Sequence, residues 1–439
     1  MCGIVGYIGK EQAAPILLEG LARLEYRGYD SAGICVAENG VLDVAKCKGR
    51  LKNLAAMTEN GALLHGTAGI GHTRWATHGE PNDINSHPHV SQNGKVALVH
   101  NGIIENYLEI REFLEEKGVQ FTSQTDSEVV AQLLEYCLGL DEVHCMQDAI
   151  YMVLHRIEGA YAFGIVCADD PERIYAARKD APLLLGYGDG CNFIASDVTA
   201  LVKYTRDVSY MEDGEVAVLT RDSIQVFNAM ELPIEKEHYH IDWEISAAEK
   251  GGYPHFMLKE IMEQPEALRR AITPRVKDGR IDFGDLILSR QTIESFNRIM
   301  IVACGSSYHV GMLGKYTIEK LTRIPVEAVL ASEFRYCDPI VDDRTLVIVI
   351  SQSGETLDTM AALREAKARG ARVLSIVNVV GSSIARESDD VLYTWAGPEI
   401  AVATTKAYST QLAVIDMLAI YMADALGKLS AQEYARLVQ

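Results

Sequence analysis

The chain has 439 residues, of which 48% are hydrophobic and 23% charged, as is typical of a globular protein with about two to four domains. Its 61 acidic and 41 basic side chains give a formal charge of −20, which repels nucleic acid and anionic membranes, so neither is expected as a partner. The nine cysteines contain no C-x-x-C pair and the N-terminus has no secretory signal, which favours a cytoplasmic protein without structural zinc.

The first half of the chain alternates between short β-rich runs and helical stretches. Helical periodicity covers residues 12–24, 107–117 and 127–138, and β-rich runs cover residues 95–100, 160–167 and 223–227. This pattern predicts an α+β domain over residues 2–228, with sheets covered by helices. A change to mixed charges and a helical run at 256–270 predicts a connector over residues 229–290.

After residue 290, strands and helices alternate strictly. Apolar strands are predicted at 298–303, 326–330, 346–350, 373–377 and 391–395, with helices at 308–322, 357–369, 383–387 and 405–426. Five apolar strands with helical crossovers predict an α/β doubly wound, five-stranded parallel sheet over residues 291–430.

Cys2 is a candidate nucleophile. If Met1 is removed, Cys2 carries a thiol and a free α-amino group, and that amine can accept the thiol proton. The alternative is that Cys2 is a small buried hydrophobe in an opening strand.

The segment 71–79 and Asp126 predict a site for an amino acid. Arg74 can hold an α-carboxylate in bidentate fashion, and Asp126 can bind the matching α-ammonium. The alternatives are a surface ion pair for Arg74, a core aromatic for Trp75, and an N-cap role for Asp126 on the helix that starts at Ser127.

Asn101 and Gly102 follow a β-rich run directly. This position suits a hairpin turn, or an oxyanion hole formed by the Asn101 amide and the Gly102 backbone N–H.

Five motifs occur in order: CGIVG at 2–6, RGYDSAG at 27–33, GHTRWATH at 71–78, HNGIIEN at 100–106 and TDSE at 125–128. Together they resemble the class II glutamine amidotransferase domain, an N-terminal-nucleophile (Ntn) fold that is an αββα sandwich. The resemblance implies that Cys2 attacks the glutamine amide, and that Asn101 and Gly102 form the oxyanion hole. It also implies a glutamine pocket lined by Arg74, Trp75, Thr77, His78, Gly102 and Asp126.

Two hydroxyl-rich loops follow the first and third strands of the second half. They are Cys304–Ser307 and Ser351–Thr356, and in a sheet of order 2-1-3-4-5 both would face the crevice at the switch point. Each opens a helix, so backbone N–H groups and hydroxyls can hold a phosphate. The alternative for a single loop is helix capping by serine.

These loops, with AGPEIAVATTKA at 396–407, resemble the sugar isomerase (SIS) domain, a flavodoxin-like fold that binds phosphorylated sugars. The resemblance implies no metal or organic cofactor. It implies that the sugar phosphate contacts Ser306, Ser307, Ser351, Gln352, Ser353, Thr356 and Val402.

The order of the two domains resembles a family of homodimeric aminotransferases that pass ammonia from L-glutamine to fructose 6-phosphate. The products are glucosamine 6-phosphate and glutamate. That family carries a second SIS domain and a tail with a reactive lysine. Because this chain carries one copy, we expect a fragment or truncated product, or a glutaminase with a non-catalytic sugar-phosphate domain. Lys406 belongs to the motif of the first copy and is not assigned that lysine's role.

Two other interpretations stay open. A phosphoribosyl amidotransferase would share the Cys2 domain but should carry an acidic diphosphate-binding motif in place of Ser351–Thr356. A non-catalytic sugar-phosphate sensor would keep Met1, and its Cys2 would be inert. The pairs His87/His89 and His238/His240 offer too few ligands for zinc.

Overall fold

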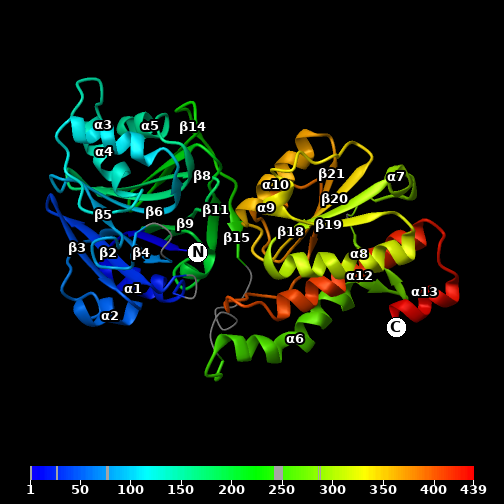
Figure 1. The fold of residues 1–439 in the computed structure, drawn as a ribbon. Helices are drawn as coiled ribbons and strands as arrows, with labels where there is room; N and C mark the ends of the chain where they lie inside the picture. Colours follow the sequence, from blue (N-terminus) through cyan, green and yellow to red (C-terminus); the bar gives the residue numbers. More distant parts are fainter. Residues whose placement is uncertain (1, 26–27, 76–78, 242–250, 285, 287) are drawn as a thin grey trace. The chain divides into compact units, whose positions relative to one another are not determined.

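A computed structural model describes residues 2–25, 28–75, 79–241, 251–284, 286 and 288–439 (Figure 1). The chain divides into two compact units, Met1–Asp242 and Trp243–Gln439. The predicted domain limits at 228 and 291 stay predictions. Two short strands, β14 (Pro233–Ile234) and β15 (Tyr239–His240), lie in the predicted connector and pair with strands of the first unit.

The first unit contains two antiparallel sheets. The strand order of the eight-stranded sheet is β15, β11 (Asp207–Tyr210), β9 (Leu184–Gly188), β10 (Cys191–Ala195), β1 (Gly3–Ile8), β4 (Ala68–Arg74), β2 (Ser31–Glu38) and β3 (Val41–Lys48). The order of the seven-stranded sheet is β14, β13 (Ile224–Phe227), β12 (Glu215–Leu219), β8 (Asp170–Lys179), β7 (Gly159–Cys167), β6 (Val96–Ile104) and β5 (His89–Val90).

Helices cover the outer faces of both sheets (Figure 1). The helices on the eight-stranded sheet are α1 (Ala13–Ala22) and α2 (Leu51–Met57), and those on the seven-stranded sheet are α3 (Tyr107–Glu116), α4 (Glu128–Leu138) and α5 (Met146–Leu154). Strand β6 shows why two cores form: Val96 and Leu98 pack under the helices, whereas Ala97 and Val99 pack between the sheets. The predicted αββα sandwich is confirmed.

Strand β6 is longer than predicted. The sequence predicts a strand that ends at His100, followed by a turn or loop at Asn101 and Gly102. In the structure the ladder continues, and Asn101 and Gly102 pair with Ala162 and Tyr161 of β7. The hairpin-turn interpretation is therefore wrong. Gly102 has a φ of +135°, and a Cβ there would lie 2.0 Å from the carbonyl oxygen of Ala160. Only glycine fits this close approach.

The second unit contains the predicted parallel sheet. Its order is β19 (Val326–Leu330), β18 (Arg298–Ala303), β20 (Thr345–Ser351), β21 (Arg372–Val377) and β22 (Asp390–Tyr393), which is 2-1-3-4-5 as expected. Helices α8 (Gly305–Thr322) and α12 (Lys406–Ala425) share a core with one face, and α9 (Ala331–Phe334), α10 (Leu357–Ala368) and α11 (Ser383–Glu387) share a core with the other. The doubly wound prediction is confirmed.

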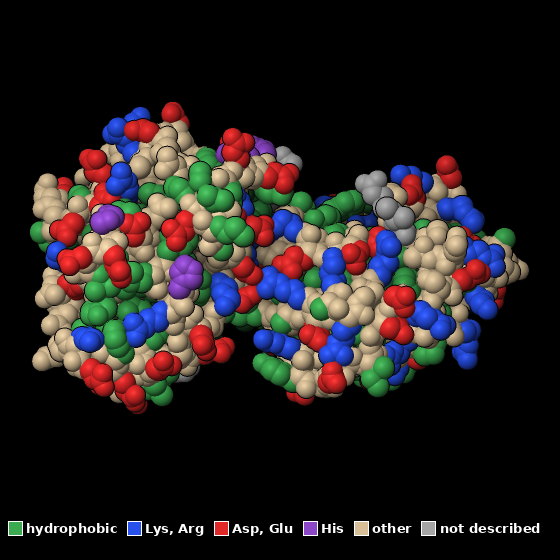
Figure 2. Space-filling model, turned by 90° about the horizontal axis from the view of Figure 1, so that it is seen from above, with side chains coloured by type: hydrophobic (Ala, Val, Ile, Leu, Met, Phe, Trp, Pro, Cys, Tyr) green, Lys and Arg blue, Asp and Glu red, His purple; other side chains and the backbone are tan. Residues whose placement is uncertain are grey.

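Further elements surround this sheet. Helix α6 (Phe256–Ile272) packs along α12 and extends the predicted 256–270 helix by two residues. The remaining elements are the short hairpin β16 (Val276–Lys277) and β17 (Arg280–Ile281), and the helices α7 (Arg290–Ser295) and α13 (Ala431–Val438). Figure 2 shows acidic and basic side chains interspersed over the visible face. In the described part of the chain, every helix is too short or too polar to cross a membrane.

Candidate functional site

Cys2 directly precedes β1, a central strand of the eight-stranded sheet, and lies beside the end of β4. Its Sγ accepts a hydrogen bond from the backbone N–H of Trp75 at 3.3 Å. Burial raises the pKa of the Cys2 thiol, and the Trp75 backbone and the Arg74 guanidinium oppose this rise. The thiol therefore keeps its proton at neutral pH until a base removes it.

Asn101 reaches Cys2 from the other sheet. Its Nδ2 donates to the backbone oxygen of Cys2 at 3.2 Å, although the two residues are 99 positions apart. Gly102 follows at the next position of β6, where its backbone is exposed. The structure thus brings the predicted nucleophile and the predicted oxyanion-hole residues together at one end of the sandwich.

Arg74 and Asp126 are buried charges of opposite sign. They are only 4% and 5% exposed, and the surface-ion-pair interpretation of Arg74 is therefore wrong. Burial lowers the pKa of the Arg74 guanidinium, while interactions with Cys2 and Asp126 oppose the change. Arg74 also donates to the backbone oxygen of Gly79 at 3.4 Å. Both charges therefore act within reach of the Cys2 site.

Asp126 does not cap the helix that follows it. Helix α4 begins at Glu128 with Ser127 at its N-cap, and Asp126 Oδ2 instead accepts the backbone N–H of Ile104 at 2.9 Å. The N-cap prediction is therefore wrong, because the N-cap is Ser127 and the Asp126 carboxylate bonds a strand N–H of β6. This bond joins Asp126 to the strand that carries Asn101.

The remaining predicted pocket residues differ in outcome. Trp75 is 42% exposed and meets Tyr29 edge to face at 5.3 Å, so it is not a core aromatic. Thr77 and His78 lie outside the described residues, as do Met1 and Arg27.

Four buried histidines lie behind the Cys2 site: His72, His87, His89 and His100. Burial lowers the pKa of each imidazole, for His72 to about 3, so the rings are neutral at pH 7. His87 stacks on His72 at 4.2 Å, and His89 bonds Thr125 at 3.0 Å. These histidines come from three separate segments of the sequence, so no single motif predicted that they would meet.

No group of three or more His, Cys, Asp or Glu side chains suited to a metal ion occurs in the described ranges. The second predicted histidine pair, His238 and His240, contacts neighbouring side chains of the first unit. His240 Nδ1 lies 2.7 Å from Asp207, and His238 packs on Tyr187 at 4.2 Å between ring centroids.

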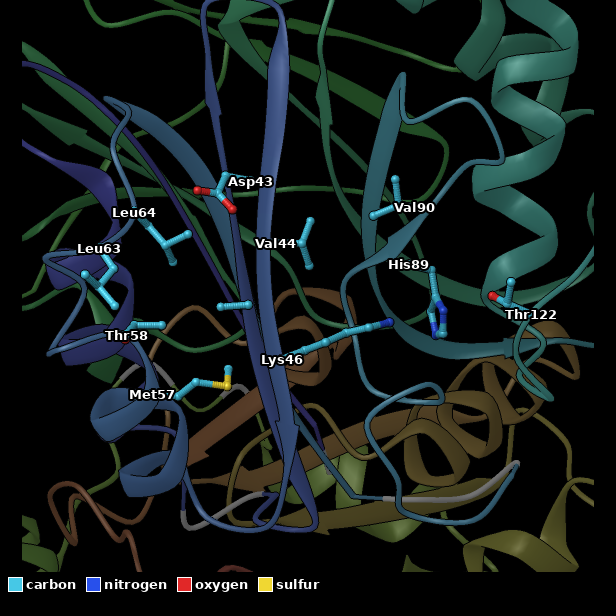
Figure 3. Close-up of a pocket in the computed structure, with 11 residues that line it drawn as sticks. Asp43, Val44, Lys46, Met57, Thr58, Leu63, Leu64, His89, Val90 and Thr122 are labelled. Atoms are coloured by element: carbon cyan, nitrogen blue, oxygen red, sulfur yellow. The ribbon is translucent and has the colours of Figure 1, made fainter.

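A separate hollow opens between β3, α2 and β5. Figure 3 shows Lys46 extending from β3 toward His89, with Met57 and Leu63 on the other side of the strand. Lys46 Nζ donates to the backbone oxygens of Ile84, Ser86 and Pro88 at 2.9–3.2 Å. The ammonium thus holds the 84–88 segment in place.

In the second unit, the two predicted phosphate loops lie at the carboxyl ends of adjacent strands. Ser351 ends β20, and its Oγ accepts the backbone N–H of Gly354 at 3.0 Å and bonds Thr356 Oγ1 at 3.0 Å. Thr359, in the first turn of α10, donates to Cys304 Sγ at 3.8 Å. This contact joins the start of α10 to the loop after β18, so the two loops lie side by side at the carboxyl edge of the sheet.

Serine capping does not account for these loops. Among the described residues, neither N-cap residue, Cys304 for α8 or Thr356 for α10, makes a side-chain cap hydrogen bond. Ser306 is exposed in the first turn of α8, and Ser307 Oγ donates to Gln411 Oε1 of α12 at 3.2 Å. The backbone N–H groups at these helix starts are thus suited to an anion.

The remaining sugar-loop residues are Gln352, Ser353 and Val402. Ser353 Oγ accepts the backbone N–H of Glu355 at 3.2 Å, and Val402 is 76% exposed in the segment before α12. Helix α6 holds that segment, because Glu260 accepts the backbone N–H of Ile400 at 2.6 Å. In this unit the structure brings every predicted residue except Val402 to the loops after β18 and β20.

Asn378 links the segment of Val402 to the second loop. It follows β21, its backbone N–H donates to the Gln352 oxygen at 3.2 Å, and its Nδ2 donates to the Gly397 oxygen at 2.9 Å. Asn378 was not predicted from the sequence. The available signal was its position: it is an amide side chain directly after the fourth strand of the parallel sheet, and ligands bind at the carboxyl ends of such strands. Lys406, in contrast, is buried against Glu263 at 2.7 Å.

Family comparisons agree with both units. A family described as "Glutamine amidotransferase domain" matches residues 72–203, and one described as "SIS domain" matches residues 292–421. The C-terminal domain of a glucosamine-fructose-6-phosphate aminotransferase from Francisella tularensis is 43% identical, with 43% of this chain and 54% of that chain covered and a TM-score of 0.42.

Whole-chain relatives extend the match. The glutamine–fructose-6-phosphate aminotransferase (isomerizing) of Clostridium tetani is 54% identical, and that of Caldanaerobacter subterraneus is 55% identical; each match covers all of this chain and 71% of the relative. Both domain families lie within those matched residues. The chain therefore belongs to the glutamine–fructose-6-phosphate aminotransferase (isomerizing) family, as an N-terminal-nucleophile amidotransferase unit followed by a SIS unit.

Proposed function

We propose that this chain hydrolyses L-glutamine at Cys2 and supplies the ammonia to fructose 6-phosphate held by the SIS unit, giving glutamate and glucosamine 6-phosphate. The observation that carries the proposal is the convergence at Cys2: Trp75 N–H lies 3.3 Å from its sulfur and the Asn101 amide 3.2 Å from its carbonyl oxygen. This geometry supports the activity that the names of the relatives state.

In the glutamine step, the α-amine of a processed Cys2 takes the thiol proton and Sγ attacks the side-chain amide carbon. The oxyanion accepts hydrogen bonds from the second Nδ2 hydrogen of Asn101 and from the Gly102 backbone N–H. The C–N bond breaks, and the nitrogen leaves as ammonia with the transferred proton. Water then hydrolyses the γ-glutamyl thioester and restores the thiol.

In the same site, Arg74 binds the α-carboxylate of glutamine and Asp126 binds its α-ammonium. Their burial supports this assignment, because buried charges strengthen interactions with a charged ligand. Trp75, Thr77 and His78 complete the pocket by family resemblance.

In the second unit, we assign the phosphate to the loops Cys304–Ser307 and Ser351–Thr356. The uncapped starts of α8 and α10 support this assignment, since backbone N–H groups suit an anion in a strongly acidic protein. Val402, in the segment tied to Gln352 through Asn378, contacts the sugar.

The test is glutamate release by the purified chain, with and without fructose 6-phosphate, together with detection of glucosamine 6-phosphate. We expect release that fructose 6-phosphate increases, and loss of release in Cys2→Ala but not in Cys47→Ala. Intact-mass measurement reports whether Met1 is removed.

The possible outcomes separate the alternatives. Release that ignores the sugar would favour a glutaminase with a non-catalytic sugar-phosphate domain. Unchanged release in Cys2→Ala would overturn the nucleophile assignment.

We also propose that the chain acts in the cytoplasm as a homodimer, with small-molecule substrates and without nucleic-acid or membrane partners. The formal charge of −20 supports the absence of polyanionic partners. Light scattering after size exclusion tests the dimer, and a mass of 48.3 kDa would contradict it.

A further inference from the structure

His72 contacts the predicted oxyanion-hole residue from behind. It lies on β4, two positions before Arg74, and is 1% exposed. Its Nε2 is 3.0 Å from Asn101 Oδ1 and 3.1 Å from the backbone oxygen of His100. On the far side, the ring of His87 stacks against it at 4.2 Å between centroids.

These contacts fix the tautomer of His72. A backbone carbonyl oxygen only accepts hydrogen bonds, so Nε2 must carry the proton. Burial lowers the pKa of His72 to about 3, so the neutral ring carries one proton and Nδ1 is left as a lone pair. Among the described atoms, the buried Nδ1 has no hydrogen-bond partner, which agrees with a ring held by its Nε2 side.

The same contacts fix the orientation of the Asn101 amide. An N–H donor on His72 requires Oδ1 to face His72, and the Cys2 carbonyl requires Nδ2 to face Cys2. The reversed amide would put an N–H against the His72 donor and an oxygen against the Cys2 oxygen. One orientation therefore satisfies both ends.

We propose that His72 is a positioning residue for glutamine hydrolysis: its Nε2–H holds Asn101 Oδ1, so that the Asn101 Nδ2 hydrogens face Cys2 and the oxyanion. This inference rests on the proposed function, in which Asn101 stabilises the oxyanion. His72 itself does not touch glutamine. Without it, the amide can turn, and the oxyanion loses a preorganised donor.

The variant His72→Phe removes the donor and keeps a ring that can stack on His87. We expect kcat for glutamate release to fall by about 10- to 100-fold, somewhat less than for loss of an entire oxyanion donor. The KM for glutamine and the rate of Cys2 alkylation by iodoacetamide should stay within about twofold, because neither depends on the oxyanion. His72→Gln, which offers a side-chain N–H, should recover part of kcat.

Two controls separate positioning from packing. His89→Phe changes another buried histidine, one that bonds Thr125. It should lower the stability of the protein but, unlike His72→Phe, should leave kcat unchanged. Adding His72→Phe to Asn101→Ala should cause no further loss of kcat, because the residues act through one amide.

The outcomes are distinguishable from failure of the proposed function itself. If Asn101→Ala keeps wild-type turnover, the oxyanion assignment fails. If Asn101→Ala loses turnover but His72→Phe does not, or if the two losses multiply in the double variant, the positioning role of His72 is overturned. If His72→Phe does not fold, His72→Leu, which also lacks a donor, and its double variant with Asn101→Ala decide the question in the same way.

Discussion

The two candidate sites are built in different ways. In the first unit, Cys2, Arg74, Asn101 and Asp126 come from segments far apart in sequence; Arg74 and Asp126 are buried, and Cys2 and Asn101 are half-buried. In the second unit, each loop is a short continuous segment. The loop after β20 bonds partly within itself, as between Ser351 and Gly354, and the loop after β18 bonds Gln411 and Thr359. A site assembled from remote segments should respond strongly to single changes, whereas a site made of two short continuous loops should respond more weakly.

The largest expected effect is that of Gly102→Ala. The new Cβ would lie 2.0 Å from the Ala160 oxygen, at a φ of +135° that alanine disfavours. We expect a loss of about 3 kcal/mol in the free energy of unfolding and a drop of at least about 100-fold in glutamate release.

Urea unfolding and glutamate release measure this effect. The matched control is Gly94→Ala, which also has positive φ but meets no atom within 4 Å. Equal losses in both variants would show that backbone strain, and not the approach to Ala160, is responsible. Fructose 6-phosphate binding should be unchanged in either variant.

Acid should separate the stabilities of the two units. The four buried histidines of the first unit have pKa values lowered below the usual 6.5, mainly by burial. Below about pH 6.5 the unfolded chain binds protons that the folded unit does not. The free energy of unfolding therefore decreases as the pH is lowered, by about 1.4 kcal/mol per pH unit for each fully titrating histidine. In the second unit, His255 and His309 are exposed.

Calorimetry between pH 7 and 5.5 should therefore show a lower unfolding temperature for the first unit on acidification, with a smaller change for the second. His89→Gln should reduce the pH slope of the first transition, and the exposed control His155→Gln should not. Equal slopes for the two units would contradict this prediction.

A smaller effect is expected for Ser351→Ala. This change removes the hydroxyl that receives the Gly354 N–H and bonds Thr356. Fructose 6-phosphate binding should weaken about tenfold or more, since hydrogen bonds near a charged group contribute about 1.5–3 kcal/mol. Titration calorimetry measures the binding, with exposed Ser295→Ala as the control. Glutamate release without sugar should not change.

The smallest expected effect is that of Gln411→Met. Gln411 is 1% exposed and accepts the Ser307 hydroxyl at 3.2 Å, while methionine keeps the volume but loses the acceptor. We expect fructose 6-phosphate to bind about fivefold more weakly, corresponding to about 1 kcal/mol. An effect larger than that of Ser351→Ala would show that the second site is also interlocked. Gln291→Met on the surface is the control.

Local patterns in the sequence determined most of the architecture. The strands 298–303 and 326–330 and the helix 383–387 match β18, β19 and α11, and the sheet has the order 2-1-3-4-5 that was assumed for it. The motifs around Cys2, Arg74 and Asn101 identified the family. Periodicity and short motifs are properties of neighbouring residues, so they can be recognised in a single amino-acid sequence.

Only the tertiary structure decided which partner each polar group takes. The ladder with β7 extended β6 through Asn101 and Gly102, against the turn that Asn-Gly favours locally. Asp126 took the Ile104 N–H rather than a cap position, and His72 and Asn378 joined segments that carry no shared motif. Hydrogen bonds between remote segments depend on how sheets and loops pack. The local sequence around one partner therefore does not predict which residue the other partner is.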